Sequence, residues 1–178
     1  MFKENYFIIT GGPGMGKTAI IEALRLKGYT VVPESGRDII REQVAAGGNA
    51  LPWADRAAFA ELMFIQAVAD YNQYSSSTEP VFFDRGIADT IGYLQLCGLS
   101  VPEEMLITAK ELCYHNKVFI TPPWEEIFHQ DAERKQSFEE AVRTYEMMER
   151  VYAALGYTLV VLPEASITER TRFILENR

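Results

Sequence analysis

The sequence has few of the side chains that most often hold metals or form covalent cross-links. Its 178 residues include two cysteines, Cys97 and Cys113, and two histidines, His115 and His129. Their arrangement does not match the ligand spacing of a zinc site, and a disulfide would need an oxidising compartment. We therefore expect two reduced, mostly buried thiols, and we assign no metal-binding role to the histidines.

Long hydrophobic runs are lacking as well. Near the N-terminus the apolar run covers only residues 6–9. This run is too short for the core of a signal peptide and far too short for a membrane span. We therefore expect a cytoplasmic protein with no membrane partner.

Positive charge is also scarce. The chain has 17 lysines and arginines against 25 aspartates and glutamates, which gives a formal net charge of -8. An acidic surface repels the phosphate backbone of nucleic acids, so we do not expect broad nucleic-acid binding. A small phosphate-bearing ligand is still compatible with a few converging donors. No pattern in the sequence specifies an oligomeric state.

The rest of the composition is that of an ordinary globular protein, with 48% hydrophobic and 24% charged residues. A chain of this length has room for one hydrophobic core of ordinary size. We therefore expect a single domain over residues 1–178.

Short apolar runs recur along the chain and predict strands. They cover residues 6–9, 31–32, 81–83, 118–120 and 159–162. The runs do not alternate with polar residues, which is typical of strands buried on both faces of a parallel sheet. Helical patterns lie between them, so the sequence predicts a three-layer, doubly wound α/β domain with about five parallel strands.

The helical segments carry start signals and different degrees of amphipathicity. Residues 138–155 place apolar side chains at three- and four-residue steps and begin with a capping box, Ser137 with Glu140. The same start signal recurs at Ser100 with Glu103 and at Ser166 with Glu169. Residues 54–74 are apolar on nearly every side, which predicts a helix buried between neighbours.

The strongest motif is a phosphate-binding loop of the form G-x-x-x-x-G-K-[ST] between a predicted strand and a predicted helix. Glycines let successive backbone N–H groups point at an anion, and the following helix adds its N-terminal partial positive charge. The predicted nucleotide-binding residues are Gly11, Gly12, Pro13, Gly14, Met15, Gly16, Lys17 and Thr18, together with Ile20 in the helix. The expected ligand is ATP with Mg²⁺.

Chemistry assigns roles to the charged groups near this loop. Lys17 is expected to reach the β- and γ-phosphates, and the Thr18 hydroxyl is placed to bind Mg²⁺. Asp84 ends the third predicted strand and is expected to be the second group of the Mg²⁺ site, directly or through water. The alternative for Asp84 is a cap on the following helix.

Two further residues at strand ends fit phosphoryl transfer to a small acceptor. Glu34 follows the second predicted strand and is a candidate general base for the acceptor hydroxyl, the alternative being a helix cap. Ser35 is able to serve as that cap instead. Arg85 is a candidate clamp on phosphate oxygens, and a structural ion pair with Glu34 is compatible with that role.

Other classes of P-loop protein fit less well. A GTPase would carry Asn-Lys-x-Asp after a late strand, whereas the segment beginning at Asn116 lacks the aspartate and runs into a strand. A ring-forming ATPase motor would show an Asp-Glu pair after the third strand, but the pair here is Asp84-Arg85. A motor of that class would also carry a C-terminal helical lid domain.

A segment after the fourth predicted strand resembles a lid. Pro122 and Pro123 end the strand, and the polar stretch that follows contains Arg134 and Lys135. A basic side chain on such a lid would close over the triphosphate and exclude water. Arg134 is the stronger candidate, and the alternative is a solvated charged turn.

Together these residues resemble a known family. The P-loop, Pro33-Glu34, Phe83-Asp84-Arg85-Gly86, Pro123-Trp124 and Asp131-x-x-Arg134 look like the predicted ATPases often labelled AAA-type. That group is placed with the nicotinamide riboside kinase domain, near the nucleoside and nucleotide kinases. The resemblance covers about residues 5–175.

The resemblance implies a parallel five-stranded core, ATP as donor and a lid between the fourth strand and the long helix. In deoxyribonucleoside kinases a Pro-Glu after the second strand carries the base, and an acid–Arg pair after the third serves metal and phosphate. Glu34, Asp84 and Arg85 occupy matching places. The sequence departs from those kinases at Asp84, where they have Glu.

The acceptor site is expected between Glu34 and the lid. The candidate substrate residues are Arg37, Asp89 and Tyr93, with Arg41 and Trp53 nearby, and each alone is compatible with a structural role. Trp53 and Tyr93 in particular fit a core position better than a stacking platform. The leading interpretation is a kinase that phosphorylates a hydroxyl of a nucleoside, riboside or similar metabolite. The alternatives are a nucleotide-dependent switch and a slow ATPase without a dedicated acceptor.

Overall fold

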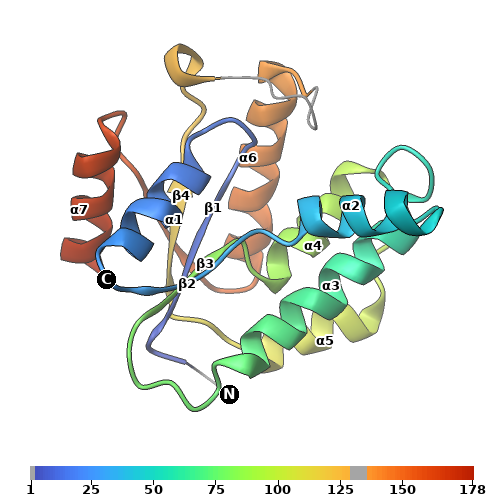
Figure 1. The fold of residues 1–178 in the computed structure, drawn as a ribbon, viewed down its shortest axis with the longest axis horizontal. Coiled ribbons are helices and arrows are strands. Elements are labelled where there is room, and N and C mark those ends of the chain that lie inside the picture. Colours follow the sequence, from blue (N-terminus) through green and yellow to red (C-terminus); the bar gives the residue numbers. More distant parts are fainter. Residues whose placement is uncertain (1–2, 129–135) are drawn as a thin grey trace.

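The computed structural model describes residues 3–128 and 136–178, in which a five-stranded sheet lies between two layers of helices (Figure 1). The strands are β1 (Tyr6–Gly11), β2 (Thr30–Val32), β3 (Val81–Asp84), β4 (Lys117–Thr121) and β5 (Thr158–Val161). Their order is β2-β3-β1-β4-β5, and every neighbouring pair is parallel. The structure confirms the predicted doubly wound α/β fold.

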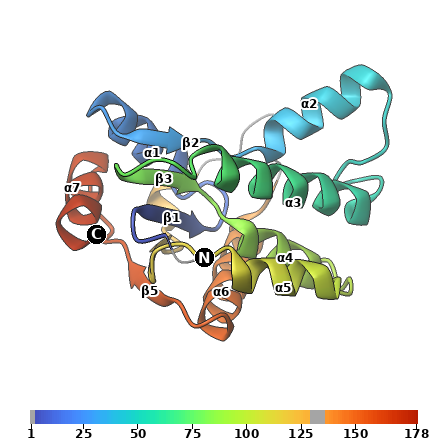
Figure 2. The same cartoon turned by 90° about the horizontal axis from the view of Figure 1, so that it is seen from below.

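Helices cover both faces of the sheet. One face packs against α1 (Lys17–Leu26) and α7 (Ile167–Asn177). The other face packs against α4 (Ile87–Leu96) and α6 (Phe138–Ala154), with α5 (Glu103–Glu111) beside α4. Two further helices, α2 (Gly36–Ala46) and α3 (Arg56–Gln73), lie side by side and extend away from the sheet (Figure 2). The chain thus leaves the β2 end, forms this helical pair and returns through β3.

The central strands carry the core on both faces. Along β1, Tyr6 and Ile8 pack into the cluster under α4 and α6, whereas Phe7 and Ile9 pack into the cluster under α1. The outer strands are less buried than we expected from their apolar runs, since β2 and β5 each pair on one side only. Val161 of β5, for example, is 47% exposed. The expectation of burial on both faces therefore holds for the central strands only.

Local start signals were read correctly in two of three cases. The Ser137 hydroxyl accepts from the Glu140 amide, and the Glu140 carboxylate accepts from the Ser137 amide, which closes the capping box of α6. Ser166 and Glu169 close the same box at the start of α7. The prediction for Ser100 was wrong, because Pro102 takes the N-cap position and α5 begins only at Glu103.

The helix predicted over residues 54–74 exists as α3, but it is not buried all round. Its buried side chains are Phe59, Ala60 and Tyr71, whereas Ile65 is 56% exposed. The helix packs against α4 along one side only, and another of its sides lines a cavity described below. Within residues 3–128 and 136–178, no helix is both long and apolar enough to cross a membrane.

Candidate functional site

The loop from β1 to α1 starts where the chain passes tightly between two other elements. Gly11 has φ 127°, and a Cβ atom there would lie 2.6 Å from the Thr121 carbonyl oxygen of β4. A Cβ atom on Gly12 would lie 2.4 Å from the Ala141 carbonyl oxygen of α6. Both approaches are to backbone atoms, which cannot rotate away. These two positions therefore require glycine.

We expect Gly11→Ala to lower the free energy of unfolding by about 2 kcal/mol or more, because either the loop or β4 must shift. Urea unfolding monitored by circular dichroism measures the change. Gly28→Ala is the matched control, since its φ is 88° but no atom lies within 4 Å of the added methyl. The control is expected to lose only about 1 kcal/mol from backbone strain. Equal losses in the two variants would contradict the steric argument.

The first cavity, of about 440 Å³, lies over the P-loop and the start of α1. Its loop side is formed by Pro13, Gly14, Met15, Gly16, Lys17, Thr18 and Ala19. Gly11 and Gly12 precede it and shape the loop without lining the cavity. Ile20, predicted among the nucleotide-binding residues, is fully buried in the core between α1 and the sheet. Its assignment to the nucleotide is therefore wrong, because its position on α1 faces the sheet.

Lys17 is held inside the site rather than extended into solvent. Its side chain is largely buried, and Nζ donates to the Gly12 carbonyl oxygen at 2.5 Å. The loop is also fixed from the far side, since the Trp124 amide donates to the Met15 sulfur at 3.2 Å. These two contacts hold the Lys17 ammonium group and the P-loop backbone in position without a bound ligand.

Asp84 has the environment of a cation-binding carboxylate. It is 6% exposed, and its Oδ1 atom is buried without a hydrogen-bond partner among the described residues. Burial raises the pKa of Asp84 to about 6, although Lys17 opposes this rise. The alternative role as a helix cap is not what the structure shows, because Gly86 is the N-cap of α4 and its amide donates to Asp89.

These residues fit a magnesium ion that is held mainly by its nucleotide. The orphaned Asp84 oxygen and the Thr18 hydroxyl are oxygen ligands of the kind Mg²⁺ prefers. Among the residues that the structure describes, no group of three or more His, Cys, Asp or Glu side chains gathers to hold a metal. A magnesium ion at this place would therefore take its remaining ligands from phosphate oxygens and water.

Arg85 joins the two strand ends on either side of the site. Its Nη1 atom donates to the Gly11 carbonyl oxygen at 3.2 Å and to Asp89 at 3.1 Å, and its Nε atom lies 3.5 Å from Glu34. Burial lowers the pKa of this guanidinium, but the Glu34, Asp89 and Asp84 carboxylates outweigh burial and raise it. The backbone of Arg85 has φ 76°, a left-handed conformation that is strained for any residue except glycine.

Asp89 has no capacity left for a substrate. Its Oδ1 atom accepts from the Thr10 hydroxyl and from Arg85, and its Oδ2 atom accepts from the Gly86 amide and the Tyr152 hydroxyl. Four donors saturate a carboxylate. Asp89 therefore holds Arg85 and the start of α4 in place, which corrects its prediction as a substrate residue. Sequence reasoning did not find its partner Tyr152.

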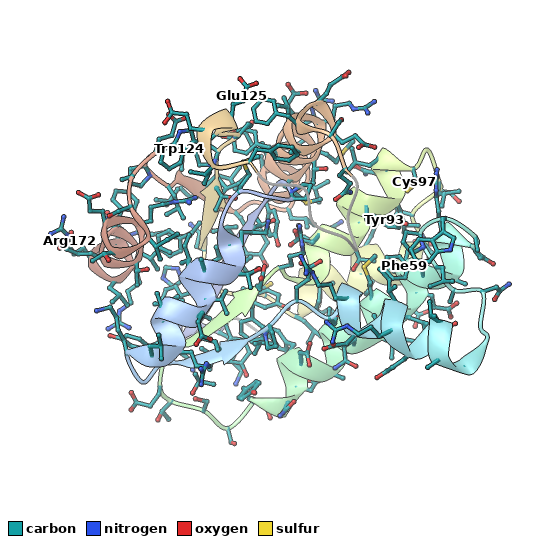
Figure 3. All side chains as sticks on the ribbon, turned by 45° about the horizontal axis from the view of Figure 1, so that its top comes forward. Phe59, Tyr93, Cys97, Trp124, Glu125 and Arg172 are labelled. Atoms are coloured by element: carbon teal, nitrogen blue, oxygen red, sulfur yellow. The ribbon has the colours of Figure 1, made fainter. Side chains whose placement is uncertain are left out.

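A second cavity, of about 590 Å³, opens between α2, α3, α4 and α6. Its lining includes Glu34, Asp84, Arg85 and Tyr93. The Tyr93 ring packs edge-on against Phe59 at 5.7 Å, and Figure 3 shows the two rings with Cys97 on neighbouring helices. Pro13, Glu34 and Gln136 line both cavities, so the two meet at these residues.

Other predicted acceptor residues lie elsewhere. Arg37 lines the first cavity instead of the second, because it projects from the first turn of α2 towards the P-loop side. Arg41 lines neither cavity and pairs with Asp38 at 3.3 Å on the surface. Trp53 is not a core residue: it is 64% exposed at the edge of the second cavity. Arg134 and Lys135, the predicted lid cations, lie outside the described residues.

One side of the first cavity combines the segment after β4, where a lid was predicted, with a part after β5 that sequence reasoning missed. It is formed after β4 and after β5 by Trp124, Ile127, Phe128, Ala165, Ser166, Ile167 and Arg170. Ligands of open α/β sheets bind beyond the carboxyl ends of the strands. Applying that rule to β5, as it was applied to β2 and β3, would have pointed to the Ala165–Ile167 turn.

Comparison with protein families gives a match over most of the chain. A family model described as an AAA domain matches residues 6–170. The chain belongs to this family. No curated protein matches it by sequence. The family assignment agrees with the P-loop domain resemblance predicted from the residues.

Solved structures with the same fold include several kinases. One structure of the NadR protein in complex with NR has a TM-score of 0.68 at 17% identity and covers 98% of this AAA domain chain. The chain spans 51% of that NadR chain. Thymidylate kinase from Ehrlichia chaffeensis has a TM-score of 0.65 at 14% identity, with 97% of each chain covered. Deoxyadenosine kinase from M. mycoides has a TM-score of 0.59 at 15% identity, also with 97% of each chain covered. At these identities the likeness shows a shared fold and no more.

Proposed function

We propose that this AAA domain protein is a small-molecule kinase that transfers the γ-phosphoryl group of MgATP to a hydroxyl of a nucleoside, riboside or similar metabolite. The observation that carries the proposal is the junction of the two cavities. One cavity contains the P-loop and suits the donor, and the other suits an acceptor. The carboxylate of Glu34 lines both, where the transferred group would pass between them.

The charges at the junction fit an alcohol better than a phosphate as the acceptor. Three carboxylates, Glu34, Asp84 and Asp89, influence one another there, with Lys17 and Arg85 as the cations. The whole lining of the second cavity is acidic as well, with a balance of two negative charges, which disfavours an anionic acceptor there. The charged residues of that lining are Glu34, Asp70, Asp84, Asp89 and Glu140 against Arg56, Arg85 and Arg143. A neutral hydroxyl meets no such repulsion and can donate its proton to Glu34.

In the proposed reaction Glu34 accepts the proton of the acceptor hydroxyl. The acceptor oxygen forms a bond to the γ-phosphorus, and the bond from that phosphorus to the oxygen shared with the β-phosphate breaks, releasing ADP. Lys17 is placed at the P-loop to hold the phosphates, and Arg85 to stabilise the charge that moves to the leaving group. A bound Mg²⁺ ion would neutralise phosphate charge next to Asp84 and Thr18.

The small-molecule ligands and activities of the structural neighbours support the acceptor class. One neighbour is a NadR protein bound to NR, and another is a deoxyadenosine kinase with the products dCMP and dCDP. Shikimate kinases are also among the neighbours, so the fold accepts non-nucleoside alcohols as well. The size of the second cavity, about 590 Å³, is compatible with either kind of acceptor.

A screen of ADP release tests the proposal. Purified protein with MgATP is incubated with nucleosides, ribosides, sugars and nucleotides, and ADP is measured with and without each acceptor. We expect stimulation by at least one hydroxyl-bearing acceptor and a phosphorylated product of matching mass. Binding of MgATP without stimulation by any acceptor would instead favour a nucleotide-dependent switch or a slow ATPase.

A further inference from the structure

Arg170 is the most buried cation whose role the proposed reaction does not use. It lies on α7 and is 1% exposed. Among the described residues it is the largest side chain that is fully buried. Its Nη1 atom donates to the Met15 carbonyl oxygen of the P-loop at 3.1 Å. Its Nε atom is buried and has no hydrogen-bond partner among the described residues.

Among the residues that the structure describes, no carboxylate compensates the charge of Arg170. Burial lowers its pKa, and no carboxylate contributes to that shift. The ion pairs found among the described residues do not include it. A buried guanidinium without an anion is unfavourable, so its retention needs a partner that arrives from outside the chain.

The position of Arg170 says where that partner would bind. Its side chain lines the first cavity together with the P-loop. The Nη1 atom would lie 3.0 Å from a Cβ atom on Gly16, so the guanidinium lies against the loop immediately before Lys17. A polyphosphate bound in this cavity would bring negative charge to the guanidinium.

We propose that Arg170 is a donor-site residue that supplies positive charge to the phosphate chain of the bound nucleotide. The inference rests on the nucleotide-binding part of the proposed function and not on the identity of the acceptor. It gives α7, the last helix of the chain, a direct part in nucleotide binding. The Met15 contact fixes the guanidinium, so the charge is positioned before the nucleotide enters.

The test compares two substitutions of the same kind on one helix. Arg170→Met removes the buried cation, and Arg172→Met removes an exposed one that pairs with Glu176 at 3.9 Å. Figure 3 labels Arg172 on α7 at the outer side of the molecule. Dissociation constants for MgATP and for Mg-tripolyphosphate are measured by titration calorimetry, and circular dichroism confirms the fold. Arg170→Gln and Arg170→Lys complete the series.

We expect Arg170→Met to weaken both ligands by about tenfold to a hundredfold, the range typical of hydrogen bonds to charged groups. Arg172→Met should match the wild type, and Arg170→Lys should lie between the wild type and Arg170→Met. If Arg170→Met fails to fold, Arg170→Gln carries the same comparison.

Three results would overturn the inference. The first is that Arg170→Met and Arg170→Gln both bind MgATP with a dissociation constant within twofold of that of Arg172→Met. The second is that Arg170→Lys weakens binding of both ligands as much as Arg170→Met and Arg170→Gln do. The shape of the arginine side chain, and not its charge, would then explain the effect. The third is weakening of MgATP without weakening of tripolyphosphate, which would assign Arg170 to the base or ribose. Failure of the kinase proposal is separate: wild-type protein would bind MgATP, yet no acceptor would be phosphorylated.

Discussion

Glu34→Gln is expected to lower kcat for acceptor phosphorylation by about a hundredfold to ten-thousandfold, the usual contribution of a general base. Glutamine keeps the shape of the side chain but cannot accept the acceptor proton. The affinity for MgATP should stay within about threefold, since the phosphates are held by the P-loop. Steady-state kinetics with the acceptor found in the screen, together with MgATP titration, measure the two quantities separately.

Glu42→Gln is the matched control for this prediction, because Glu42 is an exposed glutamate on α2 close in sequence to Glu34. It should leave both quantities unchanged. A second readout is the loss of the ionisation of Glu34 from the pH profile of kcat. Equal kcat in Glu34→Gln and Glu42→Gln would remove the general base from the mechanism and leave Glu34 as the ion-pair partner of Arg85.

Asp84→Asn should have opposite effects on stability and on activity. Without nucleotide or metal, we expect the free energy of unfolding at pH 8 to rise by roughly 2–3 kcal/mol, which corresponds to about 5 °C or more in Tm. Activity with MgATP should fall at least a hundredfold, because the negative charge that suits Mg²⁺ is lost and one carboxylate oxygen becomes an amide nitrogen. Thermal unfolding in the presence of EDTA and steady-state kinetics test the two halves.

The sign of the pH effect follows from the raised pKa of Asp84, about 6 against an ordinary value of 3.8. As the pH rises between these values, the unfolded chain releases this proton first and the folded protein keeps it. Asp84 therefore destabilises the fold progressively over this window, and the full penalty is present above about pH 6. The gain from Asp84→Asn should be absent near pH 4 and present at pH 8.

Asp38→Asn is the matched control, since Asp38 is exposed and pairs with Arg41 on the surface. Its effect should be small at both pH values. A loss of stability in Asp84→Asn at pH 8 would show that the attraction of Lys17 and Arg85 outweighs burial. In that case the pKa of Asp84 would be lowered rather than raised.

Features with a local cause could be predicted from the sequence. The P-loop is a contiguous motif, and the capping boxes at Ser137 and Ser166 depend on residues three positions apart. The central strands are apolar because both of their faces are covered, so their runs stand out. Glu34 and Asp84 could be found because each directly follows an apolar run, and strand ends of a parallel sheet meet at one edge.

Features that depend on distant partners could not be predicted in the same way. The saturation of Asp89 depends on Thr10 and Tyr152, which are 79 and 63 residues away along the chain. The contact of Arg170 with Met15 joins residues 155 positions apart. The direction of Arg37 depends on how α2 leaves β2, and no local pattern contains that angle. Tertiary packing, rather than side-chain chemistry, decides each of these cases.

The left-handed backbone of Arg85 has a consequence for laboratory evolution. Glycine would adopt φ 76° without strain, but it would remove the guanidinium that pairs with Glu34 and Asp89. Asparagine, in contrast, lacks the buried charge of Asp84. Libraries of this protein that are screened for heat resistance alone should therefore keep arginine at position 85, despite its strained backbone, and enrich asparagine at position 84. The selected variants would be more thermostable but catalytically inactive. Thermostabilisation of this protein therefore needs a selection for turnover as well as for stability.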